Sequence, residues 1–326
     1  MMRGAGPERI SKRMKTLKAP FPWFGGKSNA SDLIWSRIGA DAGSYVEPFM
    51  GSAAVFLNRP AEFNGWITLN DLDGLIVNFW RSVTLFPLET AKAASQPVFE
   101  ADIHARHLAL VNRKQCLSAR LMADAAHCDP VLAGWWAWGA CVWIGGGWCA
   151  GDGPWHAEED AEGFPALTLG DGGTGVNRKL PHLGDGGKGV EAAYLERAEA
   201  WFCDLRDSFR DARIACGDWE RICSPDTMTR NGTAAVLLDP PYSQTGAVYA
   251  NDSSTVANDV RAWCVENGNN PNLRIALCGH DTEHNELEGI GWTVETWAKK
   301  GGYQGKDDRE RIWFSPHCLI GQRELF

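Results

Sequence analysis

Four residues that could do chemistry, Asp239-Pro240-Pro241-Tyr242, stand directly after a short apolar run, Ala234 to Leu238. An apolar run of this length predicts a buried strand. The strand must end at Asp239, because two consecutive prolines cannot continue the hydrogen bonds of a sheet. We therefore expect a carboxylate, two prolines and an aromatic ring at the carboxyl end of a central strand, where open α/β sheets bind their ligands.

The chemistry that suits this loop is methyl transfer to an exocyclic amino nitrogen. The amino group of adenine or cytosine is a poor nucleophile, because its lone pair is delocalised into the ring. If the Asp239 carboxylate and the Pro240 carbonyl accept its two hydrogens, that lone pair becomes available for attack on a sulfonium methyl group. Tyr242 could stack on a base taken out of its helix. A proline-rich turn led by an Asp is the purely structural alternative.

A second stretch predicts a site for a nucleotide cofactor. A strand over 44–47 leads into a tight turn of small residues, and residues 53–57 form the start of a helix. The next strand, over 65–70, leads to Asp71, which lies 20 residues beyond Gly51. Rossmann-type folds place the carboxylate that binds ribose hydroxyls at about this spacing. The fingerprint G-x-G-x-x-G is absent from the turn, so a pyrophosphate is not the implied ligand.

A glycine loop precedes both stretches. Gly25 and Gly26 let the backbone approach a ligand closely, with Trp23 before them and the cation of Lys27 after them. By itself such a loop is weak evidence for a binding site.

Taken in order, these stretches resemble the Dam-type family of DNA adenine-N6 methyltransferases, which use S-adenosylmethionine. The matching segments are Trp23-x-Gly25-Gly26-Lys27, Val46-Glu47-Pro48-Phe49-x-Gly51, Asn70-Asp71 and Asp239-Pro240-Pro241-Tyr242. Two later segments, 274–281 and 310–314, resemble the strand and loop after the catalytic loop and the closing strand of the family. The resemblance covers about 18–90 and 200–326 and leaves out the middle of the chain.

The resemblance implies a cofactor-binding role for a set of loop residues. The set consists of Trp23, Gly25, Gly26, Lys27, Glu47, Pro48, Phe49, Gly51, Ser52, Asp71, Asp218 and Asp239. Of these, Trp23, Lys27, Pro48, Phe49 and Gly51 would line the methionine and sulfonium end. Asp71 would hold the ribose, and Asp218, after a strand over 212–216, the adenine amino group.

The resemblance also implies the catalytic residues: Asp239, Pro240, Pro241 and Tyr242. An Asp at the head of this loop favours adenine over the cytosine-N4 type, in which Ser commonly takes that place. The family's cofactor turn usually has a second glycine where this chain has Ala53, whose methyl group fits if the backbone there is helical. The alternatives are a cytosine-N4 or RNA methyltransferase of the same fold, and a catalytically inactive DNA-binding relative.

The domain organisation follows from the coverage of the resemblance. We expect a catalytic, S-adenosylmethionine-binding domain over 18–90 and 200–326, an inserted target-recognition region over 91–199, and a basic, disordered tail over 1–17. Within the insertion, 131–151 is rich in Trp and Gly and free of charge. This composition favours a packed aromatic wall beside the catalytic pocket over a membrane span.

Basic residues in two Gly-containing segments are predicted to contact DNA. They are Arg178, Lys179 and Lys188 in a Gly/Asp-rich loop region, and Lys299, Lys300 and Lys306 in a hairpin loop between the last two strands. The run His280 to His284 matches the zinc motif H-x-x-E-H, but it follows a strand where that motif needs a helix. We therefore expect no metal.

The composition is that of an ordinary soluble protein, with a formal net charge of -9 and ten cysteines that form no C-x-x-C pair. These features predict reduced thiols in the cytoplasm, and the resemblance implies a bacterium or a phage-infected host cell. The fold expected is α/β, the class I (Rossmann-like) methyltransferase fold, with a mostly parallel sheet, an antiparallel edge hairpin and an inserted target-recognition domain. Double-stranded DNA is the expected partner, with no membrane. The sequence carries no information on a partner nuclease.

Overall fold

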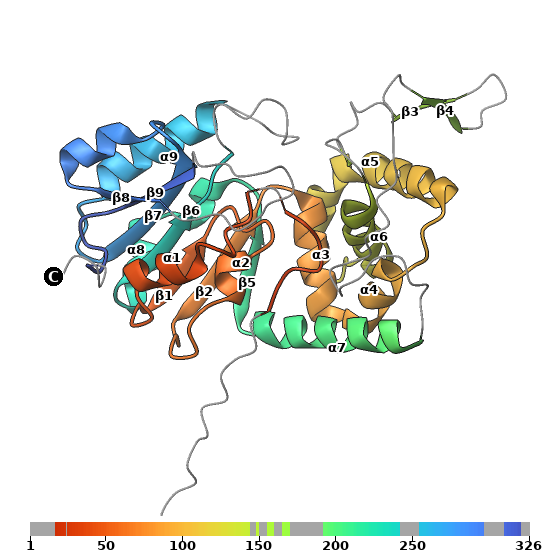
Figure 1. The fold of residues 1–326 in the computed structure, drawn as a ribbon, viewed down its shortest axis with the longest axis horizontal. Coiled ribbons are helices and arrows are strands. Elements are labelled where there is room, and N and C mark those ends of the chain that lie inside the picture. Colours follow the sequence, from red (N-terminus) through yellow and green to blue (C-terminus); the bar gives the residue numbers. More distant parts are fainter. Residues whose placement is uncertain are drawn as a thin grey trace, which may run out of the picture.

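The computed structural model describes residues 17–23, 25–143, 148–149, 155–159, 165–169, 192–241, 254–296 and 310–320. Within these residues the main element is a seven-stranded sheet with the strand order β5-β2-β1-β6-β7-β9-β8 (Figure 1). Its strands are β1 Ser44–Glu47, β2 Trp66–Asp71, β5 Ala212–Cys216, β6 Ala234–Leu238, β7 Leu273–His280, β8 Thr293–Glu295 and β9 Glu310–Phe314.

The sheet is parallel except at one edge. β1 lies between β2 and β6, and the strands from β5 to β7 run in the same direction. β9 pairs antiparallel with both β7 and β8 and so forms the edge hairpin. The carboxyl ends of β1, β2, β5 and β6 therefore meet on one edge of the sheet, which is where the predicted site residues follow these strands.

Both faces of the sheet are buried, which explains the unbroken apolar run of β6. All five residues of β6 are buried. Ala235 and Leu237 join the buried cluster on one face, while Val236 and Leu238 join the cluster on the other, because successive side chains of a strand point to opposite faces. Helices must therefore cover both faces.

The helices are α1 Ser31–Ile38, α2 Ala54–Leu57, α3 Gly74–Leu85, α4 Pro87–Ala94, α5 Glu100–Ala123, α6 Pro130–Val142, α7 Ala192–Phe209, α8 Pro225–Met228 and α9 Ser254–Asn267. Short 3-10 helices cover η1 Trp219–Ile222, η2 Thr229–Asn231 and η3 Asn285–Ile290. Buried residues of α1, α3 and α7 belong to the cluster on one face, and those of α8 and α9 to the cluster on the other.

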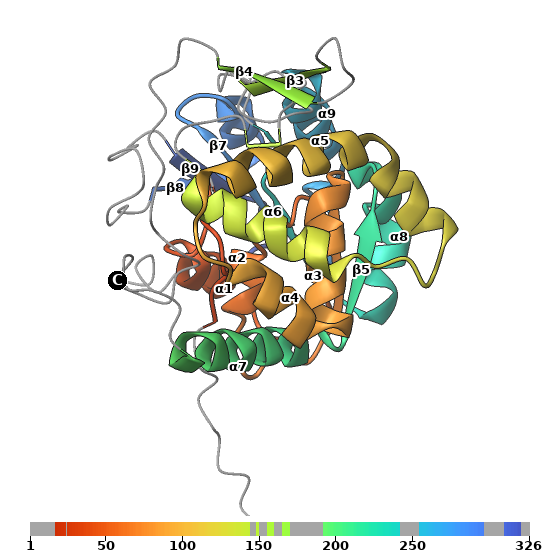
Figure 2. The ribbon, with the colours of Figure 1, turned by 90° about the vertical axis from the view of Figure 1, so that its right-hand side faces the viewer.

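Four helices form a compact layer beside the β5 edge of the sheet. Figure 2 shows α5, α6, α4 and α7 one above another, with α3 between this layer and the sheet. Gly134 of α6 lies so close to α4 that an added Cβ would be 2.4 Å from the Cβ of Ala93. Trp136 of α6 belongs to the same buried cluster as Tyr45 of β1. The helices of the predicted insertion are thus continuous with the core, and the domain boundaries stay a prediction.

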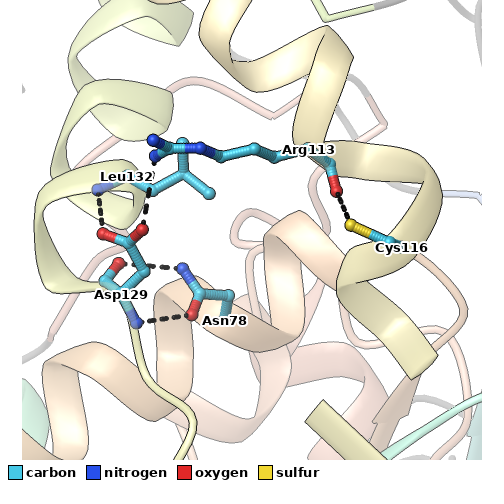
Figure 3. A network of polar contacts seen from close by, with 5 residues as sticks. All are labelled: Asn78, Arg113, Cys116, Asp129 and Leu132. Atoms are coloured by element: carbon cyan, nitrogen blue, oxygen red, sulfur yellow. Dashed lines mark hydrogen bonds and ion pairs between the residues drawn. The ribbon is translucent and has the colours of Figure 1, made fainter. Parts of the chain in front are cut away.

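A polar network connects α3 with the start of α6 (Figure 3). Asp129 caps α6 by accepting a hydrogen bond from the Leu132 N–H at 2.8 Å. Its backbone exchanges two hydrogen bonds with the Asn78 amide, at 3.0 and 3.1 Å. Arg113 of α5 lies 3.4 Å from the Asp129 carboxylate. These contacts tie three helices together at one point.

The structure departs from the sequence expectations in one segment of the insertion. Part of the region read as Gly/Asp-rich loop forms an antiparallel hairpin of β3 Trp155–Glu159 and β4 Pro165–Leu169. The alternation of apolar and polar residues from Trp155 to Glu158 is the signal that was missed. None of the described helices combines the length and the apolar character needed to cross a membrane.

Candidate active site

A pocket of about 150 Å³ lies at the carboxyl ends of the parallel strands. It is lined by Trp23, Pro48, Phe49, Gly51, Asn70, Asp71, Leu72, Asp73, Ile76, Gly217, Asp218, Trp219, Asp239, Pro241 and Val256. Residues that are far apart in the chain meet here because the loops after β1, β2, β5 and β6 leave the same edge of the sheet.

The turn after β1 needs a glycine at position 51. Gly51 has a φ of +42°, which an L side chain rarely adopts, and an added Cβ would lie 2.4 Å from Nε1 of Trp23. The Gly51 N–H donates to the Asp71 carboxylate at 3.0 Å, and its carbonyl accepts from the Trp80 indole at 2.9 Å. The turn is therefore held on both sides, with the Trp23 ring packed directly on it.

Ala53 also has a left-handed backbone, with a φ of 51° and a ψ of 32°. The expectation that its methyl group fits a helical backbone holds only for the right-handed region. In the left-handed region Cβ approaches the following carbonyl, which costs about 1–2 kcal/mol. The residue is fully buried, so its methyl group also gains packing. Alanine therefore occupies a left-handed position of the turn that glycine would adopt without strain.

Asp71 sits at the end of β2 with both carboxylate oxygens engaged by the backbone. One oxygen accepts from the Gly51 N–H and the other from the Asp73 N–H, at 3.0 and 2.9 Å. Burial raises the pKa of Asp71 to about 7, while the backbone N–H groups act in the opposite direction. The carboxyl group therefore changes its charge near neutral pH.

Asn70 clamps the loops around this carboxylate. Its side-chain amide donates to the Pro48 carbonyl at 3.0 Å and to the Gly217 carbonyl at 2.9 Å. It is only 1% exposed. A single side chain thus joins the loops after β1, β2 and β5. Asp218, next along the chain, accepts from the Glu220 N–H at 2.8 Å and caps η1.

Aromatic rings form part of the pocket wall. Trp219 lies beside Phe49, with ring centroids 6.2 Å apart and planes tilted by 31°. On the other side Trp23 packs against Trp136 of α6, with centroids 6.4 Å apart. The Trp-rich helix α6 therefore supports the pocket from behind through Trp23.

The predicted catalytic loop begins where β6 ends. Asp239 and Pro241 line the pocket, and Pro240 is buried. The Lys27 ammonium lies 2.9 Å from both oxygens of the Asp239 carboxylate and donates to the Gly25 carbonyl at 2.6 Å. Burial lowers the pKa of Lys27 more than any single neighbour raises it, but Asp239, Cys278 and Glu310 together outweigh burial and raise the pKa above its usual value.

Glu47 lies behind the pocket. It is 4% exposed and accepts a hydrogen bond from the Tyr45 hydroxyl at 2.9 Å. Burial raises the pKa of Glu47 to about 8, the hydrogen bond from Tyr45 lowers it, and the carboxylates of Asp239 and Asp71 raise it further.

The structure thus brings many of the predicted cofactor and catalytic residues into one pocket. Its lining includes Trp23, Pro48, Phe49, Gly51, Asp71, Asp218, Asp239 and Pro241. Outside the lining are Gly25, Gly26, Lys27, Glu47, Ser52 and Pro240. Tyr242 and the predicted DNA contacts lie outside the described residues: Arg178, Lys179, Lys188, Lys299, Lys300 and Lys306.

Three features of the site were missed in the sequence. Trp219 directly follows a predicted ligand residue and could have been included for that reason. Asn70 is a polar residue that ends a buried strand, which is a signal for a clamp. The pairing of Lys27 with Asp239 joins residues 212 positions apart, and no local pattern indicates it. In the part of the chain that the structure describes, no cluster of three or more His, Cys, Asp or Glu side chains could hold a metal ion.

The fold and the pocket together define the class of protein. A mostly parallel seven-stranded sheet with an antiparallel edge is the Rossmann-like methyltransferase architecture, so the predicted fold class is confirmed. Residues 23–99 match the family model of the D12 class N6 adenine-specific DNA methyltransferases. The resemblance to Dam-type enzymes is thereby confirmed, and with it the general activity, methylation of adenine in DNA. No curated protein matched the chain.

The matched residues carry one half of the site. They include the loop at Trp23, the turn at Gly51 and the end of β2 at Asp71. The predicted catalytic loop lies beyond them and is brought to the same pocket by the pairing of β6 with β1.

Proposed function

We propose that the chain is a site-specific DNA methyltransferase that transfers a methyl group from S-adenosylmethionine to N6 of an adenine flipped out of double-stranded DNA. The observation that carries this proposal is the meeting of Asp71 and Asp239 in one pocket at the carboxyl edge of the sheet. The Asp71 carboxylate suits the hydroxyl groups of a nucleoside. The Asp239 carboxylate suits an amino group that has to release a hydrogen.

The chemistry of the pocket walls fits S-adenosylmethionine. Phe49, Ile76 and Trp219 offer apolar surface to an adenine ring, and the carboxylates of Asp71 and Asp218 can accept hydroxyl and amino hydrogens. Carboxylates also favour a ligand with positive charge. Bound in this pocket, S-adenosylmethionine would supply a methyl group made electrophilic by its sulfonium sulfur.

The residues of the chain would act on the target base by position and charge. The Asp239 carboxylate accepts one amino hydrogen and lies where it can take that proton as the nitrogen forms its new bond. Pro240 has a fixed φ, so its carbonyl is held in place to accept the second hydrogen. Catalysis of this kind comes from orientation and from hydrogen bonds that strengthen in the transition state.

Recognition of the DNA sequence is assigned to the region 91–199, whose helices α5 and α6 stand on the side of the sheet where β5 lies (Figure 1). The basic residues proposed as DNA contacts belong to this region and to the loop before β9. Such an enzyme would work in the cytoplasm, where the DNA of a bacterium or an infecting phage is found.

The experiment that tests the proposal uses the full chain, S-adenosylmethionine with a labelled methyl group, and unmethylated double-stranded DNA. Label is expected in N6-methyladenine after digestion of the DNA to nucleosides. Asp239→Asn should lower the rate by about 100-fold or more, because it removes the charge that accepts the amino hydrogen. Asp226→Asn, at an exposed position of α8, is the matched control and should keep the wild-type rate.

The nucleoside that carries the label separates the alternatives. Label in N4-methylcytosine, or only in RNA offered as a substrate, would replace the proposed target. S-adenosylhomocysteine binding without any transfer would favour an inactive relative. If Asp239→Asn were as active as the control variant, the assignment of the catalytic loop would be wrong.

A further inference from the structure

A buried ion pair holds the carboxylate at the centre of the proposed reaction. Lys27 is 3% exposed and Asp239 is 23% exposed on its side chain, so the lysine lies behind the carboxylate and the carboxylate faces the pocket. Both Asp239 oxygens lie 2.9 Å from the Lys27 ammonium. The ammonium also donates to the Gly25 carbonyl at 2.6 Å.

This arrangement differs from the role that the family resemblance implies for Lys27. That role is to line the methionine end of the cofactor, whereas the Lys27 side chain does not line the pocket at all. Its ammonium donates to the Gly25 carbonyl and to one oxygen of Asp239, and it lies 2.9 Å from the other oxygen. These contacts direct the ammonium toward protein oxygens and not toward a cofactor carboxylate.

The charges around the pair explain why a cation is needed there. Asp239 lies within electrostatic reach of the Glu47 carboxyl of β1 and the Cys278 thiol of β7, both of which are buried. Glu310 of β9 is 7% exposed and also lies within electrostatic reach of Lys27. Without Lys27, a negative charge on Asp239 would stand in this enclosed space with no cation beside it, which disfavours the ionised form.

We propose that Lys27 is a positioning residue for methyl transfer, which keeps Asp239 ionised and fixes its carboxylate so that its remaining lone pairs point at the target amino group. This inference rests on the proposed function. A carboxylate has about four lone-pair positions. Lys27 contacts both oxygens from the buried side, and the exposed side of the carboxylate faces the pocket, where it can accept the amino hydrogen while the ion pair stays intact.

The test compares Lys27→Met, which keeps the length of the side chain and removes its charge, with Lys27→Arg, which keeps the charge. Lys92→Met, at an exposed position of α4, is the matched control. At saturating S-adenosylmethionine, Lys27→Met should lower kcat for DNA methylation by about 100-fold at pH 7. Its kcat should then rise by about tenfold per pH unit above neutrality as Asp239 ionises.

The rescue and the binding measurement separate positioning from a merely structural role. Lys27→Arg should restore the pH profile of the wild type, even if its kcat is lower. The dissociation constant of S-adenosylhomocysteine should change by less than about threefold in Lys27→Met. A wild-type kcat and pH profile in Lys27→Met would overturn the inference. So would a loss confined to cofactor affinity, which would return Lys27 to the methionine end.

A measurement on the wild-type protein covers the case in which Lys27→Met does not fold. The Asp239 carboxyl carbon, labelled with ¹³C and assigned through Asp239→Asn, should show the ionised form throughout pH 5.5 to 8. Titration of that signal within this range would overturn the inference independently of activity. If the wild type transfers no methyl group to DNA adenine, the proposed function itself fails, which the activity of the wild type alone reveals.

Discussion

Asp71 should make binding of the nucleoside end of the cofactor depend on pH. Its two oxygens accept the N–H groups of Gly51 and Asp73, and burial raises its pKa to about 7. Above this pH the ionised carboxylate keeps lone pairs for ribose hydroxyls. Below it the group is protonated, and one acceptor position is lost. If only the ionised form binds, the dissociation constant rises by about tenfold, or 1.4 kcal/mol, for each pH unit below 7.

The assay is calorimetric titration of the full chain with S-adenosylhomocysteine from pH 5.5 to 8.5. Binding at pH 6 should be about tenfold weaker than on the plateau, with uptake of the ligand accompanied by release of a proton. Asp71→Asn should bind more weakly at pH 8 and show no slope below pH 7. Asp226→Asn, at an exposed position of α8, is the matched control and should keep the pH dependence of the wild type.

The same ionisation should appear in the stability of the protein without ligand. A carboxyl group whose pKa rises from about 3.9 in the unfolded chain holds its proton more tightly when folded. Its contribution to stability is therefore fully present below pH 4 and is lost as the pH rises to 7, by up to about 4 kcal/mol. Asp71→Asn should flatten this part of the curve in urea unfolding. A wild-type affinity that is constant from pH 5.5 to 8.5, or an unchanged slope in Asp71→Asn, would refute the reasoning.

Three further predictions concern the loops around the pocket. Gly51→Ala should weaken S-adenosylhomocysteine binding by more than about tenfold and destabilise the fold by about 1–3 kcal/mol in urea unfolding. The reason is that the new methyl group enters a left-handed turn and meets the Trp23 ring. An affinity equal to that of the wild type would contradict this prediction. Asn70→Ala should cost about 2–4 kcal/mol of stability, since two buried hydrogen bonds between loops are lost, and a change below 1 kcal/mol would show that Asn70 is no clamp. Ala53→Gly should leave the free energy of unfolding within about 1 kcal/mol of the wild-type value. Relief of left-handed strain stabilises the variant, while the loss of a buried methyl group and the freer unfolded chain destabilise it. A loss of stability above about 2 kcal/mol would show that packing of the methyl group dominates.

Much of the fold could be predicted from local patterns. The apolar run before Asp239 forms β6, the strand that leads to Asp71 forms β2, and the segment 310–314 forms β9 with the same bounds. These elements depend on the period of the apolar residues and on residues that stop strands, both of which can be read along the chain. The hairpin of β3 and β4 was missed because the surrounding glycines and aspartates masked a short alternating pattern.

Prediction of the helical layer was limited for a different reason. The composition of 131–151 indicated a packed aromatic wall, and α6 does place Trp136 against Trp23 at the pocket. The partners of α6 could not be predicted, because its apolar residues surround the whole helix and mark no single face. Its close approach to α4 depends on Gly134 meeting Ala93, which only the packing of the two helices determines.

The sequence by itself determined which strands end in chemically active residues and in what order they occur. It placed an acid after β2 and another after β6, and it placed a glycine where the turn after β1 needs one. Only the tertiary structure decided that Lys27 pairs with Asp239 and that Ala53 adopts a left-handed backbone. Strand ends follow from local propensity, whereas the strength of an ion pair depends on distance and burial, which the pairing of strands creates between residues far apart in the chain.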